Sequence, residues 1–452
     1  MALVTLAIAA GCAAVVAAAG AASTRTHASG TPFSAQVALD WNSYAVAAVR
    51  AAKTTDGLPA GAAPRFLYQT EGLLYMSYVQ AAVYDAATKI AHRYKPYHQF
   101  SVAAGDASLQ AAVIAAAYNT LVSYLGDPGS VLAALYSASI GALPADKTTA
   151  RGIAVGEAAA ADIEALRAGD GRNAVTPVFG APFTYDASNA GQWQVVAPFL
   201  ASGAQTPWVA TLKPFMLETP AQFRAPAPPA LGSDRYAKDF NETKTMGSST
   251  GSGRSPEQTA IAWFWNANAI SQQNQLYRDV AVQHGLDLVD TVRLLAMGNV
   301  TVVDAGIACF DSKYHYLHWR PISAIRNADL DGNPATQADP AWSPLLGTPN
   351  HPEYPSAHGC VSSAVTDVIA KALGTSNIDI TIWGATGGST VLAVTQHFDT
   401  AQQMQDQILD ARVWAGLHWR NSDVAGEAVG NAVAGWALQR YFTPLGRQDD
   451  GD

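Results

Sequence analysis

Apolar residues recur at intervals of three and four along most of the chain, which is the spacing that places them on one face of a helix. The pattern is clear at 67–84, 108–125 and 147–166, where alanine is dense enough for close helix packing. It resumes at about 256–282, 286–319, 356–373, 386–413 and 424–441. Alternating strand patterns are short and few, with 378–383 as an example. The pattern therefore predicts an all-α protein.

Proline, glycine, asparagine and serine interrupt the helical pattern between residues 169 and 253. A connection of this length tends to be functional or to wrap a core. A capping box with proline at the first helical position, Ser255–Gln258, marks where helix resumes. We therefore predict two helical bundles, at 35–168 and 254–445, joined by a long irregular crossing segment at 169–253.

The composition favours a large core with little charge. Of the 452 residues, 49% are hydrophobic and 14% are charged, against about 25% charged in an average soluble protein. The length allows two or three domains. The formal net charge is −9 and no basic tract occurs, so nucleic acid is not expected as a partner.

The first 22 residues carry no charge and are mostly alanine, valine, leucine and isoleucine. Small residues at 19–21 suit a cleavage site, so we interpret 1–22 as a signal peptide and expect a secreted or periplasmic protein. The alternatives are an N-terminal membrane anchor, since about 20 apolar residues can span a bilayer, and a lipid-modified Cys12. Cleavage would leave Cys309 and Cys360, either as a disulfide or as two buried thiols.

Three short segments in the C-terminal third concentrate cations, a hydroxyl and imidazoles. They are Lys313-Tyr-His-Tyr-Leu-His-Trp-Arg320-Pro321, then Pro355-Ser356-Ala357-His358-Gly359, then Ala411-Arg412-Val-Trp-Ala-Gly-Leu-His418. Such a set suits a tetrahedral oxyanion, because its oxygens need several hydrogen-bond donors at once.

The first two segments predict local structure that can grip an anion. Lys313 and Arg320 are about two helical turns apart, so both should point the same way, roughly 10 Å apart along the axis, before Pro321 ends the helix. Ser356 precedes a helical pattern, which places its hydroxyl and the Ala357 N–H at a helix N-terminus, where anions bind. The alternatives are a solvated basic face and a capping serine beside an incidental histidine.

The third segment cannot be one straight helix if both of its functional side chains serve one site. Arg412 and His418 would diverge by about 120° on a straight helix. We therefore expect Gly416 to let the chain turn between them.

The three segments resemble the marker pattern of the superfamily of vanadium-dependent haloperoxidases and related acid phosphatases, which is K-x6-R-P, then P-S-G-H, then S-R-x5-H. The first segment matches fully, Ala357 replaces the usual Gly, and Ala411 replaces the Ser of many members. Residues 212–231 also look like the bacterial haloperoxidase branch. The resemblance covers the chain from about residue 210 to its end.

The resemblance implies a vanadate cofactor and a set of residues that bind it, namely Lys313, Arg320, Ser356, the Ala357 N–H, Arg412 and His418. It further implies that His418 ligates vanadium, that His358 transfers protons and that Lys313 polarises peroxide. The ligating histidine needs a partner on its other ring nitrogen. Asp423 is our candidate, and a capping role near 424 is the alternative. The implied partners are hydrogen peroxide, a halide and a small organic acceptor, and a homo-oligomer stays open.

Halide choice and reaction type follow less directly. His351 lies shortly before Ser356, where bromide-oxidising members of the resembled family tend to carry His and chloride-oxidising members an aromatic residue. This implies that bromide and iodide are oxidised ahead of chloride, with a surface turn residue as the alternative for His351. Two other functions stay open. One is an acid phosphatase with His418 as nucleophile, and the other is a non-catalytic exported oxyanion-binding protein, motivated by Ala357 and Ala411.

Overall fold

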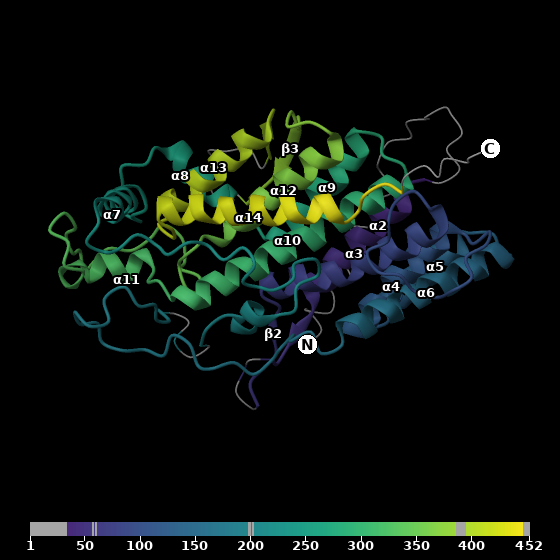
Figure 1. The fold of residues 1–452 in the computed structure, drawn as a ribbon, viewed down its shortest axis with the longest axis horizontal. Coiled ribbons are helices and arrows are strands. Elements are labelled where there is room, and N and C mark those ends of the chain that lie inside the picture. The colour runs from purple at the N-terminus through teal and green to yellow at the C-terminus, as the bar shows by residue number, and fades with distance from the viewer. Residues whose placement is uncertain are drawn as a thin grey trace. The chain divides into compact units, whose positions relative to one another are not determined.

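Helices dominate the part of the chain that the computed structural model describes, as the hydrophobic periodicity predicted (Figure 1). That part comprises residues 34–56, 58, 61–197, 200, 203–385 and 395–445. The proposed signal peptide at 1–22 lies outside the described residues. The structural account below concerns the unit that begins at Ala35.

The N-terminal helices surround one that is almost wholly buried. They are α2 (Gln36–Ala51), α3 (Gln69–Ala91), α4 (Leu109–Leu125), α5 (Val131–Gly141) and α6 (Lys147–Arg167), with a short ladder of β1 (Lys53–Thr54) and β2 (Arg65–Phe66) before α3. Every residue of α3 from Glu71 to Thr88 is buried, as expected of a helix inside a bundle. Small residues allow α4 and α6 to touch, because a Cβ at Gly156 would lie 2.4 Å from the carbonyl oxygen of Ala112.

The crossing segment after α6 is largely irregular, as predicted, but it is anchored by buried polar groups. The carboxylate of Asp304 accepts the backbone N–H groups of residues 215–217 at 2.7, 2.7 and 3.1 Å. The segment contains a short 3-10 helix, η1 (Pro207–Thr211), and one helix that the pattern did not predict, α7 (Asp234–Met246). Helix α7 is amphipathic but short, and only three of its buried residues, Tyr236, Ala237 and Phe240, are apolar, so its apolar positions are too few to stand out within the irregular segment.

The C-terminal elements confirm most of the predicted helices. They are α8 (Pro256–Phe264), α9 (Ala269–Gln283), α10 (Leu288–Tyr316), α11 (Pro321–Arg326), η2 (Ala328–Leu330), α12 (Ala357–Leu373), α13 (Ala401–Trp414) and α14 (Arg420–Arg440). Strands β3 (Ile380–Trp383) and β4 (Thr395–Phe398) pair antiparallel. Two boundaries differ from prediction. The helix expected at 256–282 breaks at residues 265–268. Of the helix expected at 386–413, residues 386–394 lie outside the described residues, 395–398 form β4, and the helix α13 begins at Ala401.

Helix α10 joins the N-terminal and C-terminal helices into one core. It packs against α3 on one side and against α12 and α14 on others (Figure 1), and one hydrophobic cluster includes Tyr78, Val300 and Val365 from α3, α10 and α12. By length and composition α10 is the one described helix that could cross a membrane, but 94% of its apolar window is buried inside the protein. Its hydrophobicity is that of a core helix.

The N-terminal turns of α12 and α14 touch because glycines line their contact. A Cβ at Gly359 would lie 2.6 Å from the Asp423 carbonyl oxygen, and one at Gly426 would lie 2.5 Å from the Ser356 carbonyl oxygen. The backbone N–H of Ser356 also donates to the carbonyl of Ser422 at 2.9 Å. This contact holds the second and third functional segments next to each other.

Candidate functional site

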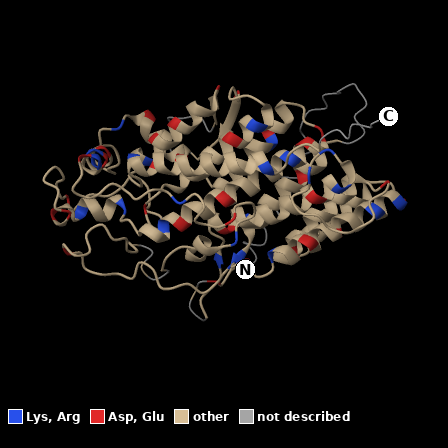
Figure 2. Cartoon of the chain, in the orientation of Figure 1, with Lys and Arg blue, Asp and Glu red and all other residues tan. Residues whose placement is uncertain are grey.

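Three cations from the predicted segments are buried, although most charges of this protein are not. Figure 2 shows Lys and Arg interspersed with Asp and Glu over the described elements. By contrast, Lys313, Arg320 and Arg412 are among the largest side chains that are fully buried. A buried charge costs free energy unless it is paired and hydrogen-bonded, so the partners of these three cations indicate their role.

Lys313 and Arg320 converge on the segment that leads into α12. The Lys313 Nζ donates to the carbonyl oxygens of Pro352 and Glu353, both at 2.9 Å, and the Arg320 Nε donates to the carbonyl of His351 at 2.9 Å. Because an ammonium has three donors, Lys313 keeps one N–H for another acceptor. Burial lowers the pKa of Lys313 to about 8 and that of Arg320 to about 10.

The two cations do not share one helix, which corrects the prediction. Helix α10 ends at Tyr316, Leu317 adopts a left-handed φ of 48°, and Pro321 begins α11 instead of ending a helix. Arg320 is the N-cap residue of α11. The turn at Leu317, rather than the spacing along one helix, therefore brings Arg320 back toward Lys313.

The side chain of Arg412 makes no hydrogen bond to any residue that the structure describes, and its Nε and Nη1 atoms are fully buried. Asp423 attracts it electrostatically, yet among the described residues neither carboxyl oxygen of Asp423 has a hydrogen-bond partner. Burial lowers the pKa of Arg412 to about 10 and raises the pKa of Asp423 well above its ordinary value. Burial thus disfavours the charged form of Asp423, and no anion is hydrogen-bonded to Arg412 among the described residues.

His418 lies in the loop between α13 and α14, where Gly416, with φ of 74°, turns the chain as predicted. Its Nε2 is 3.2 Å from the Arg320 Nη1. An arginine can only donate, so Nε2 carries the lone pair. The proton is then on Nδ1, which donates to the Glu353 Oε1 at 2.9 Å. A carboxylate on one nitrogen and a lone pair on the other is the arrangement of a metal-ligating histidine.

The carboxylate that orients His418 is Glu353, and our prediction of Asp423 was wrong. Glu353 also accepts the Trp419 N–H at 3.1 Å, and burial raises its pKa to about 7 while Lys313 and Arg320 oppose the shift. Asp423 instead lies in the first turn of α14, where it does not cap the helix. Glu353 is the one carboxylate between residues 340 and 367. A single carboxylate so close to the second segment could have indicated the partner of His418.

The N-terminus of α12 presents free donors, as predicted. Ser356 is the N-cap residue, and its hydroxyl accepts the Gly359 N–H at 3.5 Å. No described residue accepts the backbone N–H of Ala357 or His358. Ala357 is the first residue of α12 and lies outside the left-handed region. The replacement of glycine by alanine therefore strains nothing and leaves the N–H available.

His358 is half-buried, and its Nε2 is 3.2 Å from the carbonyl oxygen of Trp265. A carbonyl can only accept, so Nε2 carries the proton and Nδ1 is the basic atom. Burial, followed by the charge of Arg412, holds the pKa of His358 well below its ordinary value. The break between α8 and α9 at Trp265 positions this histidine, and no feature of the sequence indicated that role.

His351 is buried, with 7% of its surface exposed, so the alternative of a surface turn residue is wrong. Its Nδ1 lies 3.0 Å from the Arg320 Nη2 and 3.2 Å from the carbonyl oxygen of Pro352, so both neighbours hold this edge of the ring. The ring packs against Phe310 with 5.2 Å between centroids. Burial, together with Lys313 and Arg320, holds the pKa of His351 well below its ordinary value.

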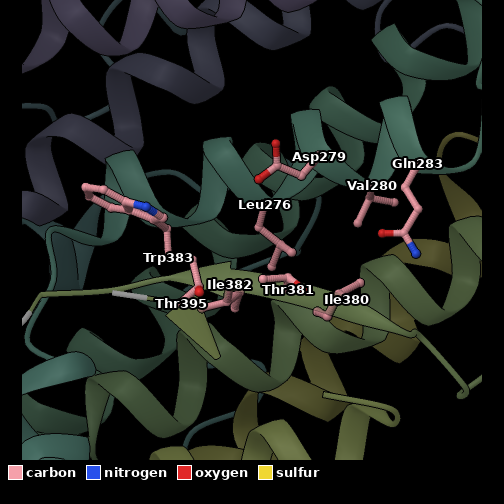
Figure 3. A pocket seen from close by; sticks show the side chains of 9 residues that line it. All are labelled: Leu276, Asp279, Val280, Gln283, Ile380, Thr381, Ile382, Trp383 and Thr395. Atoms are coloured by element: carbon pink, nitrogen blue, oxygen red, sulfur yellow. The ribbon is translucent and has the colours of Figure 1, made fainter. Parts of the chain in front are cut away.

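A cavity of about 170 Å³ opens onto these groups. Its lining includes five of the predicted site residues, namely His351, Ala357, His358, Arg412 and His418. A second pocket of about 130 Å³ lies between α9 and β3 (Figure 3). Its lining side chains, such as Leu276, Ile380 and Asp279, include no cation and no imidazole. The second pocket therefore does not suit an oxyanion.

Two thiols lie directly behind the site. Cys309 and Cys360 are both buried and free, so the alternative of a disulfide is not realised. The Cys309 Sγ contacts the carbonyl of Pro355 at 3.7 Å. Both residues act as small core side chains under the first two functional segments.

Buried, partly unpaired cations next to a helix N-terminus are suited to bind an oxyanion. Within this chain, residues 293–446 match the family model described as the VCPO second helical-bundle domain. The vanadium chloroperoxidase of Curvularia inaequalis is 27% identical over 225 residues, which cover 37% of this chain and 36% of that protein. The chain thus matches only about a third of the length of this curated relative.

The fold is also similar to those of solved bacterial proteins. The crystal structure of a bacterial vanadium-dependent iodoperoxidase aligns with a TM-score of 0.73 at 20% identity, over 93% of this chain and 99% of that one. A holo-type bacterial vanadium-dependent chloroperoxidase aligns with a TM-score of 0.65 at 20% identity, over 85% and 94%. The C-terminal bundle thus resembles the VCPO second helical-bundle domain, and the described unit has the fold of these vanadium-dependent haloperoxidases.

Proposed function

We propose that this chain is a vanadate-dependent haloperoxidase, which oxidises a halide with hydrogen peroxide to hypohalous acid. The observation that carries the proposal is the unpaired Arg412, buried beside a lone pair on the His418 Nε2. An oxyanion would supply the missing partners of Arg412, since charge-assisted hydrogen bonds are the strongest that a guanidinium makes. The residues present therefore fit vanadate.

Each group would hold a defined part of the cofactor. The oxygens of the anion would be held by the donors of Lys313, Arg320, Ser356, Ala357 and Arg412, and vanadium would be ligated by the His418 Nε2. Glu353 keeps the proton of His418 on Nδ1, so the ligating atom is ready before the anion arrives. When bound, vanadate supplies a Lewis acid that activates hydrogen peroxide.

His358 would move the protons of the reaction. Its Nδ1 is unprotonated and its ring is half-buried at the cavity, so it can take a proton from entering hydrogen peroxide. It would return that proton when one peroxide oxygen leaves as water. Hydrogen peroxide, a halide ion and one proton then give hypohalous acid and water. The remaining N–H of Lys313 would polarise the peroxide oxygen that the halide attacks.

Bromide and iodide are the proposed halides. His351 lines the cavity, so a polar imidazole faces the space that peroxide and halide would enter. An imidazole near the peroxide changes the proton balance of the site, whereas an apolar ring would keep the site dry and its electrostatics strong. The weaker oxidant suffices for bromide and iodide, which give up electrons more readily than chloride. The similarity to an iodoperoxidase fold supports this choice.

An acid phosphatase remains the second candidate, because the same donors suit phosphate and the His418 Nε2 lone pair suits a nucleophile. The two reactions are separated by assaying the purified full chain with and without orthovanadate, for bromide oxidation and for phosphate ester hydrolysis. We expect bromide oxidation that requires vanadate and is absent in His418→Ala. Phosphate ester hydrolysis without vanadate, lost in the same variant, would establish the phosphatase instead, and neither activity would leave an oxyanion-binding protein.

We further propose that residues 1–22 direct export. The support is their length and lack of charge. The mature N-terminus, determined on protein recovered from outside the cytoplasm of an expressing bacterium, should start shortly after residue 21. An intact N-terminus on membrane-bound protein would establish an anchor.

A further inference from the structure

The cavity extends beyond the proposed anion site, and its outer part has a different character. Its outer walls are apolar, formed by Leu73, Val209, Val303, Phe310 and the indole of Trp265. The indole is fixed, because its Nε1 donates to the Gln407 side chain at 2.8 Å. No carboxylate lines the cavity, and Arg412 is its one charged lining residue apart from the histidines. Such walls suit an uncharged organic molecule.

Amides are prominent among the polar groups of the cavity, which also include the hydroxyls of Thr70 and Ser362. Gln273, on α9, has 7% of its surface exposed and lines the cavity. Its side chain has no hydrogen-bond partner among the residues that the structure describes, whereas neighbouring Gln272 donates to the Trp383 carbonyl at 2.8 Å. Its amide is not among the fully buried groups without a partner, so its donor and acceptor are open to the cavity. A ligand hydroxyl could both donate to and accept from Gln273.

We propose that the outer cavity is a binding site for the organic acceptor, and that the acceptor is an uncharged single-ring phenol. This inference rests on the proposed function and names the substrate class of the same site. The whole cavity, including its part at Arg412 and His418, measures about 170 Å³, and a cavity of about 150 Å³ holds benzene, so the outer part admits no more than one ring. The ring would pack against Trp265 and Phe310, with its hydroxyl on Gln273.

Binding at this place would couple halide oxidation to halogenation. A ring carbon of the phenol attacks the halogen of hypohalous acid, so a carbon–halogen bond forms and the oxygen–halogen bond breaks. The released hydroxide takes the proton from the same ring carbon and becomes water. The acceptor lies in the cavity where hypohalous acid is released, so the acid is captured before it diffuses away.

Gly306 provides a way to close the outer cavity without touching the anion site. It lies on α10 and lines the cavity, and a Cβ built there meets no heavy atom within 4 Å. A leucine at this position would project into the space proposed for the ring. Gly435 on α14 is a matched control, because a Cβ there also meets nothing within 4 Å but the residue is exposed and does not line the cavity.

The test measures binding rather than turnover. Para-fluorophenol is titrated into the full chain and followed by fluorine NMR, with and without saturating inorganic phosphate, and fluorobenzene serves as the probe that lacks the hydroxyl. We expect saturable binding that phosphate does not displace, abolition in Gly306→Leu, and no change in Gly435→Leu. Gln273→Leu should weaken para-fluorophenol about 3- to 10-fold, as for one neutral hydrogen bond, and leave fluorobenzene unchanged.

Three results would overturn the acceptor site. They are no saturable binding, equal binding in Gly306→Leu, and displacement of the phenol by phosphate, which would place it in the anion site. The test is independent of catalysis. Phenol binding without any vanadate-dependent activity would refute the proposed haloperoxidase function and support the acceptor site. Vanadate-dependent bromide oxidation without phenol binding would support the function and refute the acceptor site.

Discussion

Two buried arginines in this protein differ in their partners, and the difference distinguishes a structural role from a role in binding. Arg167, at the end of α6, is 4% exposed and fully engaged. Its guanidinium pairs with Asp170 at 3.0 Å, donates to the carbonyls of Pro214 and Lys213, and stacks over the Phe215 ring at 4.0 Å. Arg412 is 1% exposed and has no hydrogen-bond partner among the described residues.

The difference lies in what each site lacks. Arg167 has a full set of partners and connects the crossing segment to the N-terminal helices, so its charge contributes to stability. Arg412 lacks an anion and lines a cavity that an anion can enter. A protein that keeps an uncompensated buried charge loses stability unless a ligand supplies the counter-charge. Burial alone therefore does not identify a functional arginine, whereas burial without partners does.

The largest expected effect is on stability, and it separates the two arginines. Arg167→Met should lower the free energy of unfolding by about 3–5 kcal/mol, because it leaves Asp170 buried without its cation. Arg412→Met should leave that free energy unchanged or raise it, because it removes an unpaired charge. Denaturant unfolding of both variants in buffer without phosphate or vanadate measures this. Equal destabilisation by the two substitutions would end the comparison.

A smaller effect is expected from the carboxylate that orients the ligating histidine. Glu353→Gln should weaken orthovanadate binding about 10- to 100-fold, as is typical when the partner of a metal-ligating histidine is changed. Asp423→Asn is the matched control and should change the affinity much less, because Asp423 makes no hydrogen bond to His418. Calorimetric titration of orthovanadate into both variants tests which carboxylate orients His418. A larger loss of affinity in Asp423→Asn than in Glu353→Gln would identify Asp423 as the partner.

The pH dependence of anion binding should report Lys313. Its pKa of about 8 in the empty site means that the ammonium charge is complete below that pH and is lost as pH rises through it. Phosphate affinity should therefore fall by about tenfold per pH unit above 8. Lys313→Met should bind phosphate more weakly and lack this decline. The ionisation of phosphate affects both proteins alike. If the ratio of phosphate affinities of the unmodified protein and Lys313→Met stayed constant from about pH 7 to 9, Lys313 would not be the group that titrates.

The smallest effect concerns the halide. His351→Phe should raise the ratio of chloride to bromide oxidation severalfold, because an apolar ring replaces the imidazole that lines the cavity. His318→Phe is the control, since His318 is buried but does not line this cavity. Rates with each halide, measured on the vanadate-loaded variants, give the ratio. Efficient chloride oxidation by the unmodified protein at neutral pH would contradict the role of His351.

Local chemistry explains what the sequence predicted correctly. The capping boxes, the Ser356 cap of α12 and the turn at Gly416 depend on residues within one or two turns, so their patterns are visible in the chain. The three functional segments were likewise found because each concentrates its chemistry in fewer than ten residues.

Contacts between distant segments explain the errors. Glu353 reaches His418 across 65 residues, and the carbonyl of Trp265 reaches His358 across 93. The end of α10 at Leu317 has no glycine or proline before it, and that turn carries Arg320 back to the segment that precedes α12. Such arrangements are set by tertiary packing, which no local pattern records.

The central claim is that Arg412 is unpaired because it awaits an oxyanion. The most direct test is calorimetric titration of orthovanadate into the full chain, Arg412→Met and the folded fraction of Arg167→Met. We predict one vanadate per chain, competition by phosphate, a loss of about 10- to 100-fold in affinity for Arg412→Met from the missing charged hydrogen bonds, and unchanged affinity for Arg167→Met. Unchanged affinity in Arg412→Met would contradict the account.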